Sequence, residues 1–584
     1  LITSPLRDFK NMFGLEVKKE ILPYSLYTQQ TVNEGFIDTN KCIEEVKLQY
    51  IKNNIGKEIN IDLQKEFVNE YLKNVKNWGC FSEDKKEINI LKYSSNYCKM
   101  DCEVLQSGYN MFRNSIKEIT LKWVYDREED EEVEMFLDIN NYVSIASVAQ
   151  DYMKYNGVFR DVYEVSGNVR EFINKCMYGG RTMCSQNKKI GNNQNEVLAD
   201  FDAVSLYPSA MEELQGYLKG IPKIIDNLNY DSIKNYDGYF VEIVIKSVGK
   251  KYNFPLMSRI TDKGIRDWTN EMINEYICVD KITLEELIKY HKIEFEIVRG
   301  YYFNEGRNMK LLPSIQHLFN KRLEAKKAGN PIQSVYKLLM NSSYGKTLLK
   351  PIDTQTKFVN KKEIEGFMGM NYNWIIEAEE LPCGRTVKVK LHKAINEHFN
   401  LVHCGVEVLS MSKRIMNRVM CLAEDLGIDM YYTDTDSIHI DNSKIGLLAE
   451  EYEKINGKKL IGKNMSQFHT DFSSDILKGE ITADRSIFLG KKCYIDELVG
   501  SESPDIVDYH IRLKGVPNAS ILDYCYNNKI TPYELYEELY DGKEIKFDMT
   551  CGGKKVNFKF HNNLTITTLD EFNRKIKFTE VASL

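Results

Sequence analysis

Residues Met430 to Ile440 read as two short apolar strands joined by a turn, and this turn carries two carboxylates, Asp434 and Asp436. A hairpin of this kind presents the side chains of its turn together on a rigid base. An Asp-Thr-Asp sequence also occurs in ordinary turns and in the metal-binding Asp-x-Asp clamp of sugar-nucleotide transferases. The hairpin by itself therefore leaves the function open.

A third carboxylate, Asp202, ends another predicted strand, residues 197–202 (VLADFD), after which the chain turns into a helix near Pro208. Carboxylate and phosphate oxygens are the ligands that Mg²⁺ prefers. Two such ions about 3.5–4 Å apart can activate an attacking hydroxyl and stabilise a leaving pyrophosphate. We therefore predict that Asp202 and Asp436, or Asp434 in its place, bind Mg²⁺ for phosphoryl transfer.

Between these acidic segments the sequence predicts a pair of helices. The first covers residues 313–328, Gly329-Asn330-Pro331 breaks it, and the second runs to about Tyr344. Residues four apart share a helix face, and cations on such a face can hold a triphosphate. A lone face of this type is usually only solvated, so the prediction depends on the order of the three segments. The candidates are Arg322 and Lys326 on the first helix and Lys337, Asn341 and Tyr344 on the second.

The composition argues against several classes of protein. The formal net charge of −7 counts against a simple basic nucleic-acid binder, but only weakly in a chain of 584 residues, because surface charge can be segregated. The 13 cysteines include no Cys-x-x-Cys pair, so we expect no cysteine-based zinc module and an intracellular, reducing compartment. No apolar run reaches about 18 residues, so we expect no membrane span.

Taken in order, these segments resemble the motifs of family B DNA polymerases. Asp202 to Pro208 (DAVSLYP) resembles motif A, Lys337 to Gly345 (KLLMNSSYG) resembles motif B, and Tyr432 to Ser437 (YTDTDS) resembles motif C. Lys492-Cys493-Tyr494 resembles the family's Lys-x-Tyr element near the primer terminus. The resemblance covers about residues 140–517 well and the flanks more thinly.

The resemblance implies an α+β fold, the right-hand polymerase, with an antiparallel-sheet palm, short helical fingers and a thumb. A truncated RNase H-like exonuclease region would precede it. The implied boundaries are residues 1–135 for the C-terminal part of a 3′–5′ exonuclease domain, 136–212 and 396–500 for the palm, 213–305 and 351–395 for two insertions, 306–350 for the fingers with motif B, and 501–584 for the thumb.

The resemblance also implies roles in nucleotide addition. Two Mg²⁺ ions, for which Mn²⁺ can substitute, would be held by Asp202 and Asp436, with Asp434 supporting. The ring of Tyr207 would lie under the sugar and exclude a ribose 2′-hydroxyl. The other implied nucleotide-binding residues are Ser205 and Leu206 of motif A, Arg322, Lys326 and Lys337 for the triphosphate, and Asn341 and Tyr344 beside the nascent base pair.

Five residues are implied as DNA contacts. Gly179 and Gly180 match the family's Tyr-x-Gly-Gly element, although Met177 stands at its tyrosine position. Lys413 stands where the family has an arginine that contacts the primer, without the fork geometry of a guanidinium. Lys492 and Tyr494 would steady the primer strand.

Near the N-terminus, Tyr97 to Asp101 (YCKMD) resembles the third proofreading exonuclease motif, Tyr-x3-Asp. On a helix Tyr97 and Asp101 share a face. The acidic motifs I and II should precede this segment, and the chain begins at Leu1 rather than at a methionine. We therefore expect a fragment or processed product that does not proofread unaided, because one carboxylate cannot hold two metal ions.

The spacing favours the protein-primed branch of the family. Asp202 and Arg322 are 120 positions apart (322 − 202), and a β-rich stretch, Tyr239 to Ile245, lies between them. Protein-primed members carry two insertions, one between motif A and the fingers and one between motifs B and C, which grip the terminal protein and encircle the template. In this chain they would be roughly residues 213–305 and 351–395. Such enzymes occur in viruses, linear plasmids and self-synthesising transposons, which implies the host cytoplasm or nucleus.

The sequence therefore predicts a DNA-dependent DNA polymerase that is protein-primed. Its expected partners are template and primer DNA, deoxynucleoside triphosphates and a terminal protein, with no membrane. Two alternatives stay open: a family B polymerase that extends nucleic-acid primers, and a non-catalytic DNA-binding remnant. A separate subdomain at 213–305 would favour protein priming.

Overall fold

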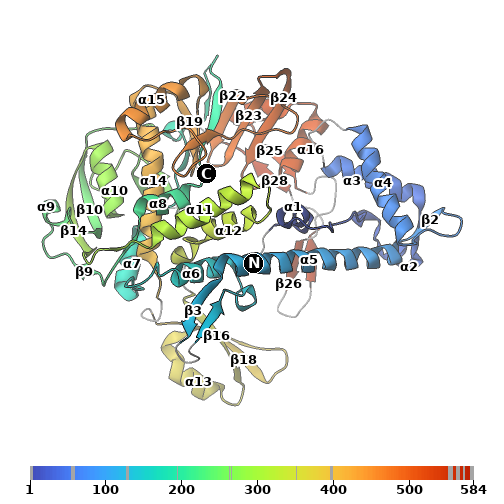
Figure 1. The fold of residues 1–584 in the computed structure, drawn as a ribbon, viewed down its shortest axis with the longest axis horizontal. Coiled ribbons are helices and arrows are strands. Elements are labelled where there is room, and N and C mark those ends of the chain that lie inside the picture. Colours follow the sequence, from blue (N-terminus) through green and yellow to red (C-terminus); the bar gives the residue numbers. More distant parts are fainter. Residues whose placement is uncertain are drawn as a thin grey trace. The chain divides into compact units, whose positions relative to one another are not determined.

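The computed structural model (Figure 1) describes residues 4–53, 60–126, 131–193, 195–261, 264, 266–349, 352–394, 399–549, 557–560, 566–569 and 573–578. The chain divides into two compact units, Leu1–Tyr152 with His317–Ser342, and Met153–Gln316 with Ser343–Leu584. This division differs from the boundaries at 135 and at 306–350 that we expected for the exonuclease region and the fingers. Within the described residues, no helix is long and apolar enough to cross a membrane.

The first unit is mainly helical, and its longest helix is α5 (Ile90–Thr120). Asn89 caps α5 by accepting a hydrogen bond from the Lys92 amide. The buried aromatic rings of Tyr71 and Tyr93 lie 5.0 Å apart in the core of this unit. The other principal helices of its N-terminal segment are α1 (Phe9–Phe13), α3 (Thr39–Asn53) and α4 (Ile61–Asn77).

The predicted helix pair is confirmed as α11 (Leu311–Lys327) and α12 (Gln333–Ser342). Between them Gly329 has a φ of +65°, a left-handed conformation that glycine adopts without steric cost. Most of α11 and all of α12 belong to the first unit.

The second unit is built on one large antiparallel sheet. Its strand order is β24-β23-β22-β7-β20-β19-β5. The predicted strand at 197–202 and the predicted hairpin at 430–440 are both confirmed within it. The bounds are β5 (Thr182–Cys184), β7 (Leu198–Ala203), β19 (Met430–Asp434), β20 (Ser437–Asp441), β22 (Ile481–Gly490), β23 (Cys493–Gly500) and β24 (Ser503–Leu513).

The first expected insertion folds around a second sheet, of order β13-β10-β14-β9. β10 is buried on both faces. One face shares a core with Leu284 of the helix that follows β13, and Phe240 of the other face lies in a second buried cluster with Val402 and Val406. The hydrophobic core of this insertion extends into the rest of the unit, because it also includes Tyr178 and Cys421, which lie outside residues 213–305. The bounds are β9 (Lys223–Ile224), β10 (Gly238–Val248), β13 (Tyr276–Asp280), α10 (Lys281–Glu286) and β14 (Ile293–Phe303).

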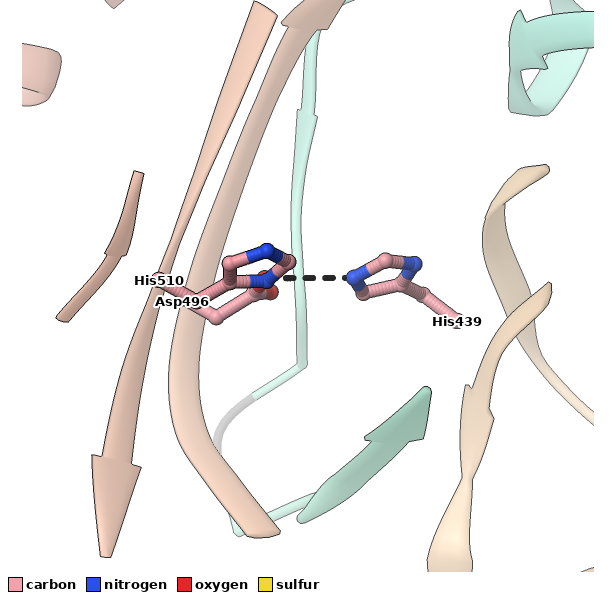
Figure 2. Close-up of side chains that lie close together, drawn as sticks. All are labelled: His439, Asp496 and His510. Carbon is pink, nitrogen blue, oxygen red and sulfur yellow. Dashed lines mark hydrogen bonds and ion pairs between the residues drawn. The ribbon is translucent and has the colours of Figure 1, made fainter. Parts of the chain in front are cut away.

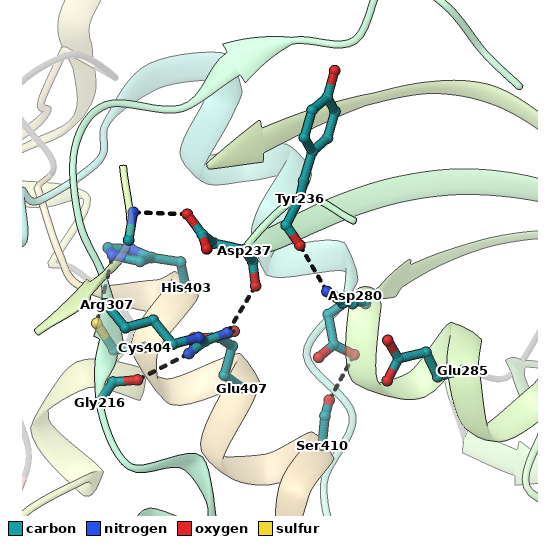
Figure 3. Close-up of polar contacts among 12 residues, drawn as sticks. Gly216, Tyr236, Asp237, Asp280, Glu285, Arg307, His403, Cys404, Glu407 and Ser410 are labelled. Carbon is teal, nitrogen blue, oxygen red and sulfur yellow. Dashed lines mark hydrogen bonds and ion pairs between the residues drawn. The ribbon is translucent and has the colours of Figure 1, made fainter. Parts of the chain in front are cut away.

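Buried polar contacts fasten this insertion and the segment after it to α14 (Val402–Asp425) (Figure 3). Arg307 donates to the two carboxylate oxygens of Glu407 at 2.6 and 3.2 Å. Ser410 donates to Asp280 at 2.8 Å. Both carboxylates are buried. Loss of Arg307 would leave the Glu407 charge without its ion-pair partner, whereas loss of Ser410 would remove one hydrogen bond from Asp280, which still accepts one from the Thr283 amide at 3.2 Å.

The second expected insertion is a small three-stranded sheet of order β16-β18-β17. Its buried side is made by Val387, Val389 and Leu391 of β18. The prediction of β-structure at 351–395 is confirmed for the part that is described. The elements are β16 (Thr354–Asn360), α13 (Ile364–Asn371), β17 (Ile375–Glu380) and β18 (Thr386–His392).

The C-terminal part packs against the far end of the large sheet. α16 (Asn518–Asn528) and α17 (Pro532–Tyr540) share a hydrophobic core with β22 and β23. The expected thumb boundary at residue 501 precedes β24, which is an edge strand of the large sheet. The sheet therefore continues past that boundary, to Leu513.

Candidate active site

The three predicted carboxylates come together at one end of the large sheet. Asp434 pairs with Ser437 across the hairpin, and Ser437 pairs with Asp202 of β7. Directly opposed residues of antiparallel strands project to the same face with Cβ atoms about 4.5–5.5 Å apart. Asp434 and Asp202 therefore lie on either side of Ser437, in one row across three strands. Asp436 lies beside this row, and its backbone carbonyl accepts a hydrogen bond from the Ala203 amide at 2.8 Å.

Gly180 permits the conformation of the carboxylate turn. Thr435 has a φ of +67°, and a Cβ added at Gly180 would lie 2.5 Å from the Thr435 Cγ2 atom. The Thr435 amide donates to the Arg181 carbonyl at 2.9 Å. The Thr182 hydroxyl donates to Asp434 at 3.0 Å. Gly180 thus leaves the space that the Thr435 side chain of this turn occupies, a role that the sequence did not indicate.

Lys492 forms an ion pair with one of these carboxylates. Its amino group lies 2.9 Å from each carboxylate oxygen of Asp434. Burial raises the pKa of Asp436, and the carboxylates of Asp434 and Asp200 raise it further. Carboxylates that lie this close together are stabilised in the charged form by a bound cation. This all-oxygen donor set suits Mg²⁺.

Asp200 is a site residue that we did not predict. It lies two residues before Asp202 on β7, so both side chains project to the same face. Burial raises its pKa. It lines, with Asp434 and Asp436, a cavity of about 520 Å³. The alternation Asp200-Phe201-Asp202 was the signal that could have identified it.

Two tyrosines from separate motifs stack beside this site. Ser205, with a φ of +49°, begins α8 (Leu206–Leu214), and Tyr207 follows on its first turn. The rings of Tyr207 and Tyr344 have centroids 4.3 Å apart and planes at 24°. Leu206 is buried under this turn.

The remaining nucleotide-binding candidates belong to the first unit. Arg322 and Lys326 lie on α11, and Lys337 and Asn341 lie on α12. Partial burial lowers the pKa of Arg322, whereas Lys326, Lys337 and Asn341 are exposed. Their predicted contacts with a nucleotide stay predictions.

Two predicted DNA contacts have internal partners instead. The amino group of Lys413 donates to the carbonyls of Tyr178 and Leu409 at 2.6 and 2.8 Å, and burial lowers its pKa to about 7. A phosphate contact needs an accessible ammonium group, so this arrangement does not support the primer contact expected of Lys413. Tyr494 is buried, with its ring 4.8 Å from that of Tyr432. It is therefore part of the core beneath the site.

In the first unit, Tyr97 and Asp101 share a face of α5, as predicted. Lys19 contacts both: its amino group lies 2.5 Å from the Tyr97 hydroxyl and 2.6 Å from Asp101. The Tyr24 hydroxyl lies 2.8 Å from that of Tyr97. The Asp101 carboxylate is thus neutralised by an ion pair within the chain.

Comparison with protein families gives one match that covers most of the chain. The model of DNA polymerase type B, organellar and viral, matches residues 1–419. A probable DNA polymerase of Ascobolus immersus is 24% identical over 470 residues, covering 77% of this chain and 34% of that protein. A DNA polymerase of Kluyveromyces lactis is 23% identical over 516 residues, covering 84% and 45%. The chain thus spans less than half the length of these two relatives.

Solved structures of Phi29 DNA polymerase share the fold. The ternary complex with primer-template DNA and incoming nucleotides superposes with a TM-score of 0.55 at 14% identity, covering 99% of this chain and 78% of that one. The orthorhombic crystal form gives a TM-score of 0.54 with the same identity and coverage. The right-hand polymerase fold expected from the sequence is therefore confirmed.

Proposed function

The chain belongs to the organellar and viral type B DNA polymerases, and we propose that it adds deoxynucleotides to a primer 3′ hydroxyl as a DNA template directs. The observation that carries this proposal is the row formed by Asp434, Ser437 and Asp202, with Asp436 at its edge. A cluster of carboxylates on rigid strands is what two-metal phosphoryl transfer requires.

The metal ligands in this proposal are Asp202 and Asp436, with Asp434 supporting. They would hold two Mg²⁺ ions, for which Mn²⁺ can substitute. Ions bound there polarise the attacking hydroxyl and neutralise the leaving pyrophosphate. Lys492, which now pairs with Asp434, keeps a positive charge beside the reacting phosphate.

Substrate selection in this proposal depends on Tyr207. Its ring is held by Tyr344, so it presents a fixed edge to the sugar of the incoming nucleotide. Lys326, Lys337 and Arg322 would bind the triphosphate as cations, and Asn341 would lie beside the base pair. Gly179 and Gly180 would let the template backbone approach closely, since neither carries a side chain.

We further propose that synthesis is protein-primed, inside the host cell, in the cytoplasm or nucleus. The support is the first insertion, which has its own sheet and is fastened to α14 by the buried pairs Arg307–Glu407 and Asp280–Ser410. A fixed platform of this type suits the grip on a terminal protein. Initiation on a template that carries no nucleic-acid primer tests this, with and without a terminal-protein candidate. Initiation without the candidate, or a need for a nucleic-acid primer even when the candidate is present, would refute the proposal.

Single-nucleotide incorporation tests the polymerase activity itself. Four primer–templates that differ only in the templating base are incubated with each deoxynucleotide and Mg²⁺. We expect only the complementary nucleotide to be added. No addition on any substrate would favour the alternative of a non-catalytic DNA-binding remnant. Addition that ignores the template would refute template-directed synthesis.

A further inference from the structure

Three potential metal ligands lie close together on three strands of the large sheet (Figure 2). One of them is two residues along β20 from Ser437 of the carboxylate row. They are His439 of β20, Asp496 of β23 and His510 of β24. The Nε2 atom of His439 and the Nδ1 atom of His510 each lie 3.1 Å from the same oxygen, Oδ2 of Asp496. Ligands bound to one tetrahedral ion at 2.0–2.1 Å lie about 3.3 Å apart. Both nitrogen–oxygen separations are already close to this value.

The groups around these ligands are those that support a metal ion. The free Nδ1 atom of His439 faces Oδ1 of Asp200 at 4.0 Å, and neither atom has a hydrogen-bond partner. The other oxygen of Asp496 accepts a hydrogen bond from the Ser486 hydroxyl at 2.8 Å. In metal sites a ligating histidine usually directs its second nitrogen to a carboxylate, and a ligating carboxylate is itself hydrogen-bonded.

The cluster is enclosed on one side and accessible on the other. His439 and Asp496 are fully buried, and the rings of Phe488 and Tyr494 lie 5.0 and 5.1 Å from the His439 ring. The side chain of His510 is 22% exposed and lines the cavity of about 520 Å³. An ion can therefore enter from this cavity, and water or another ligand can complete its coordination there.

We propose that His439, Asp496 and His510 bind one divalent transition-metal ion of the zinc class. Imidazole ligands suit Zn²⁺ and Co²⁺, whereas Mg²⁺ prefers oxygen ligands alone. The site is therefore chemically distinct from the carboxylates proposed for Mg²⁺.

A metal ion at this place would join two parts of the sheet that otherwise have little direct pairing. β22 pairs with β7 only at Ala483 and Leu198. His439 lies on the hairpin that carries the catalytic carboxylates, and Asp496 lies on the strand that follows Lys492. The ion would thus fix the position of Lys492 relative to Asp434, and it would stabilise the folded chain by binding to it.

Cobalt titration of the full chain tests the proposal. The protein is freed of metal with a chelator and titrated with Co²⁺ in a large excess of Mg²⁺, and the visible absorption of bound Co²⁺ is recorded. We expect one Co²⁺ per chain, displaced by Zn²⁺ and not by Mg²⁺. The variants Asp496→Asn and His510→Gln should lose this signal. His392→Gln, at an exposed histidine of the second insertion, is the matched control and should keep it.

The melting temperature gives a second readout that does not depend on activity. Zn²⁺ should raise it for the wild-type chain and for His392→Gln, but not for His510→Gln. The absence of bound Co²⁺ in the wild-type chain would overturn the proposal and leave a hydrogen-bonded cluster only. Undiminished binding in a folded His510→Gln or Asp496→Asn variant would overturn it equally.

Discussion

Tyr207 stacks on Tyr344, with ring centroids 4.3 Å apart and an angle of 24° between the ring planes. Tyr207 follows β7, the strand that carries Asp202, and Tyr344 follows α12. Stacked aromatic pairs contribute about 0.5–1.5 kcal/mol beyond the area they bury. Tyr344 therefore restricts the orientation of the ring that we assign to sugar selection.

Tyr207→Val should relax the discrimination against ribonucleotides. Removal of the ring opens the space that a 2′-hydroxyl needs, so we expect the ratio of kcat/KM for deoxynucleotides over ribonucleotides to fall at least tenfold, or about 1.4 kcal/mol. Tyr207→Phe keeps the ring and should retain the ratio. Unchanged selectivity in the valine variant would refute the assignment.

Gly180→Ala should impair the carboxylate turn. The new Cβ would lie 2.5 Å from Thr435 Cγ2, and relief of such a clash in a packed region costs about 1–3 kcal/mol. We expect a clear fall in kcat with a folded protein. Gly446→Ala is the control, because this exposed glycine has no assigned role and a Cβ there meets nothing within 4 Å. Equal activity of the two variants would show that the turn does not depend on Gly180.

The stability of the first insertion should depend on pH through His291. This buried ring accepts a hydrogen bond from the Leu256 amide at 3.0 Å, and its Nδ1 lies 2.8 Å from the Lys250 carbonyl. Burial lowers the pKa of His291 from 6.5 to about 4, so only the unfolded chain takes up a proton between these values. The contribution, on the order of 3 kcal/mol, is present in full above pH 6.5 and is lost as the pH falls towards 4.

Thermal unfolding at pH 7 and pH 5 measures this effect. The melting temperature should drop less between these pH values in His291→Gln than in the wild-type chain. The exposed His392→Gln should behave as wild type. The same drop in all three proteins would exclude His291 as the titrating group.

Proofreading should be absent from this chain by itself. Of the exonuclease motifs, the resemblance identifies only the third, and its Asp101 is paired with Lys19. A labelled primer with a mismatched 3′ end should therefore remain intact during incubation with Mg²⁺ and no nucleotides. Steady shortening from the 3′ end would contradict this, provided that a Tyr97→Phe, Asp101→Ala variant abolishes it and so excludes a contaminating nuclease.

Local patterns predicted much of the fold. The carboxylate hairpin, the strand before Asp202 and the two helices around Gly329 each depend on periodicity and turn residues within a few positions. The sequence order of the motifs then allowed the resemblance to a polymerase. Contacts between distant segments could not be predicted in this way.

Apart from Asp200, which the local alternation Asp200-Phe201-Asp202 could have identified, the missed features depend on such distant contacts. Gly180 meets Thr435 across 255 positions (435 − 180), and His439 meets Asp496 across 57. Lys413 has a charge that suggests a surface, yet its amine is satisfied by carbonyls inside the fold. The contacts of these residues depend on whether each is buried, rather than on its residue type. Burial in turn depends on how distant strands and helices pack together.

Replacement of Asp436 tests the central claim most directly. Template-directed incorporation and primer–template binding are measured side by side for the wild-type chain, Asp436→Ala and Asp505→Ala, which removes an exposed carboxylate on β24. We predict that Asp436→Ala loses synthesis and keeps DNA binding, whereas Asp505→Ala keeps both. Synthesis at the wild-type rate in Asp436→Ala would contradict the assignment of this carboxylate row as a polymerase site.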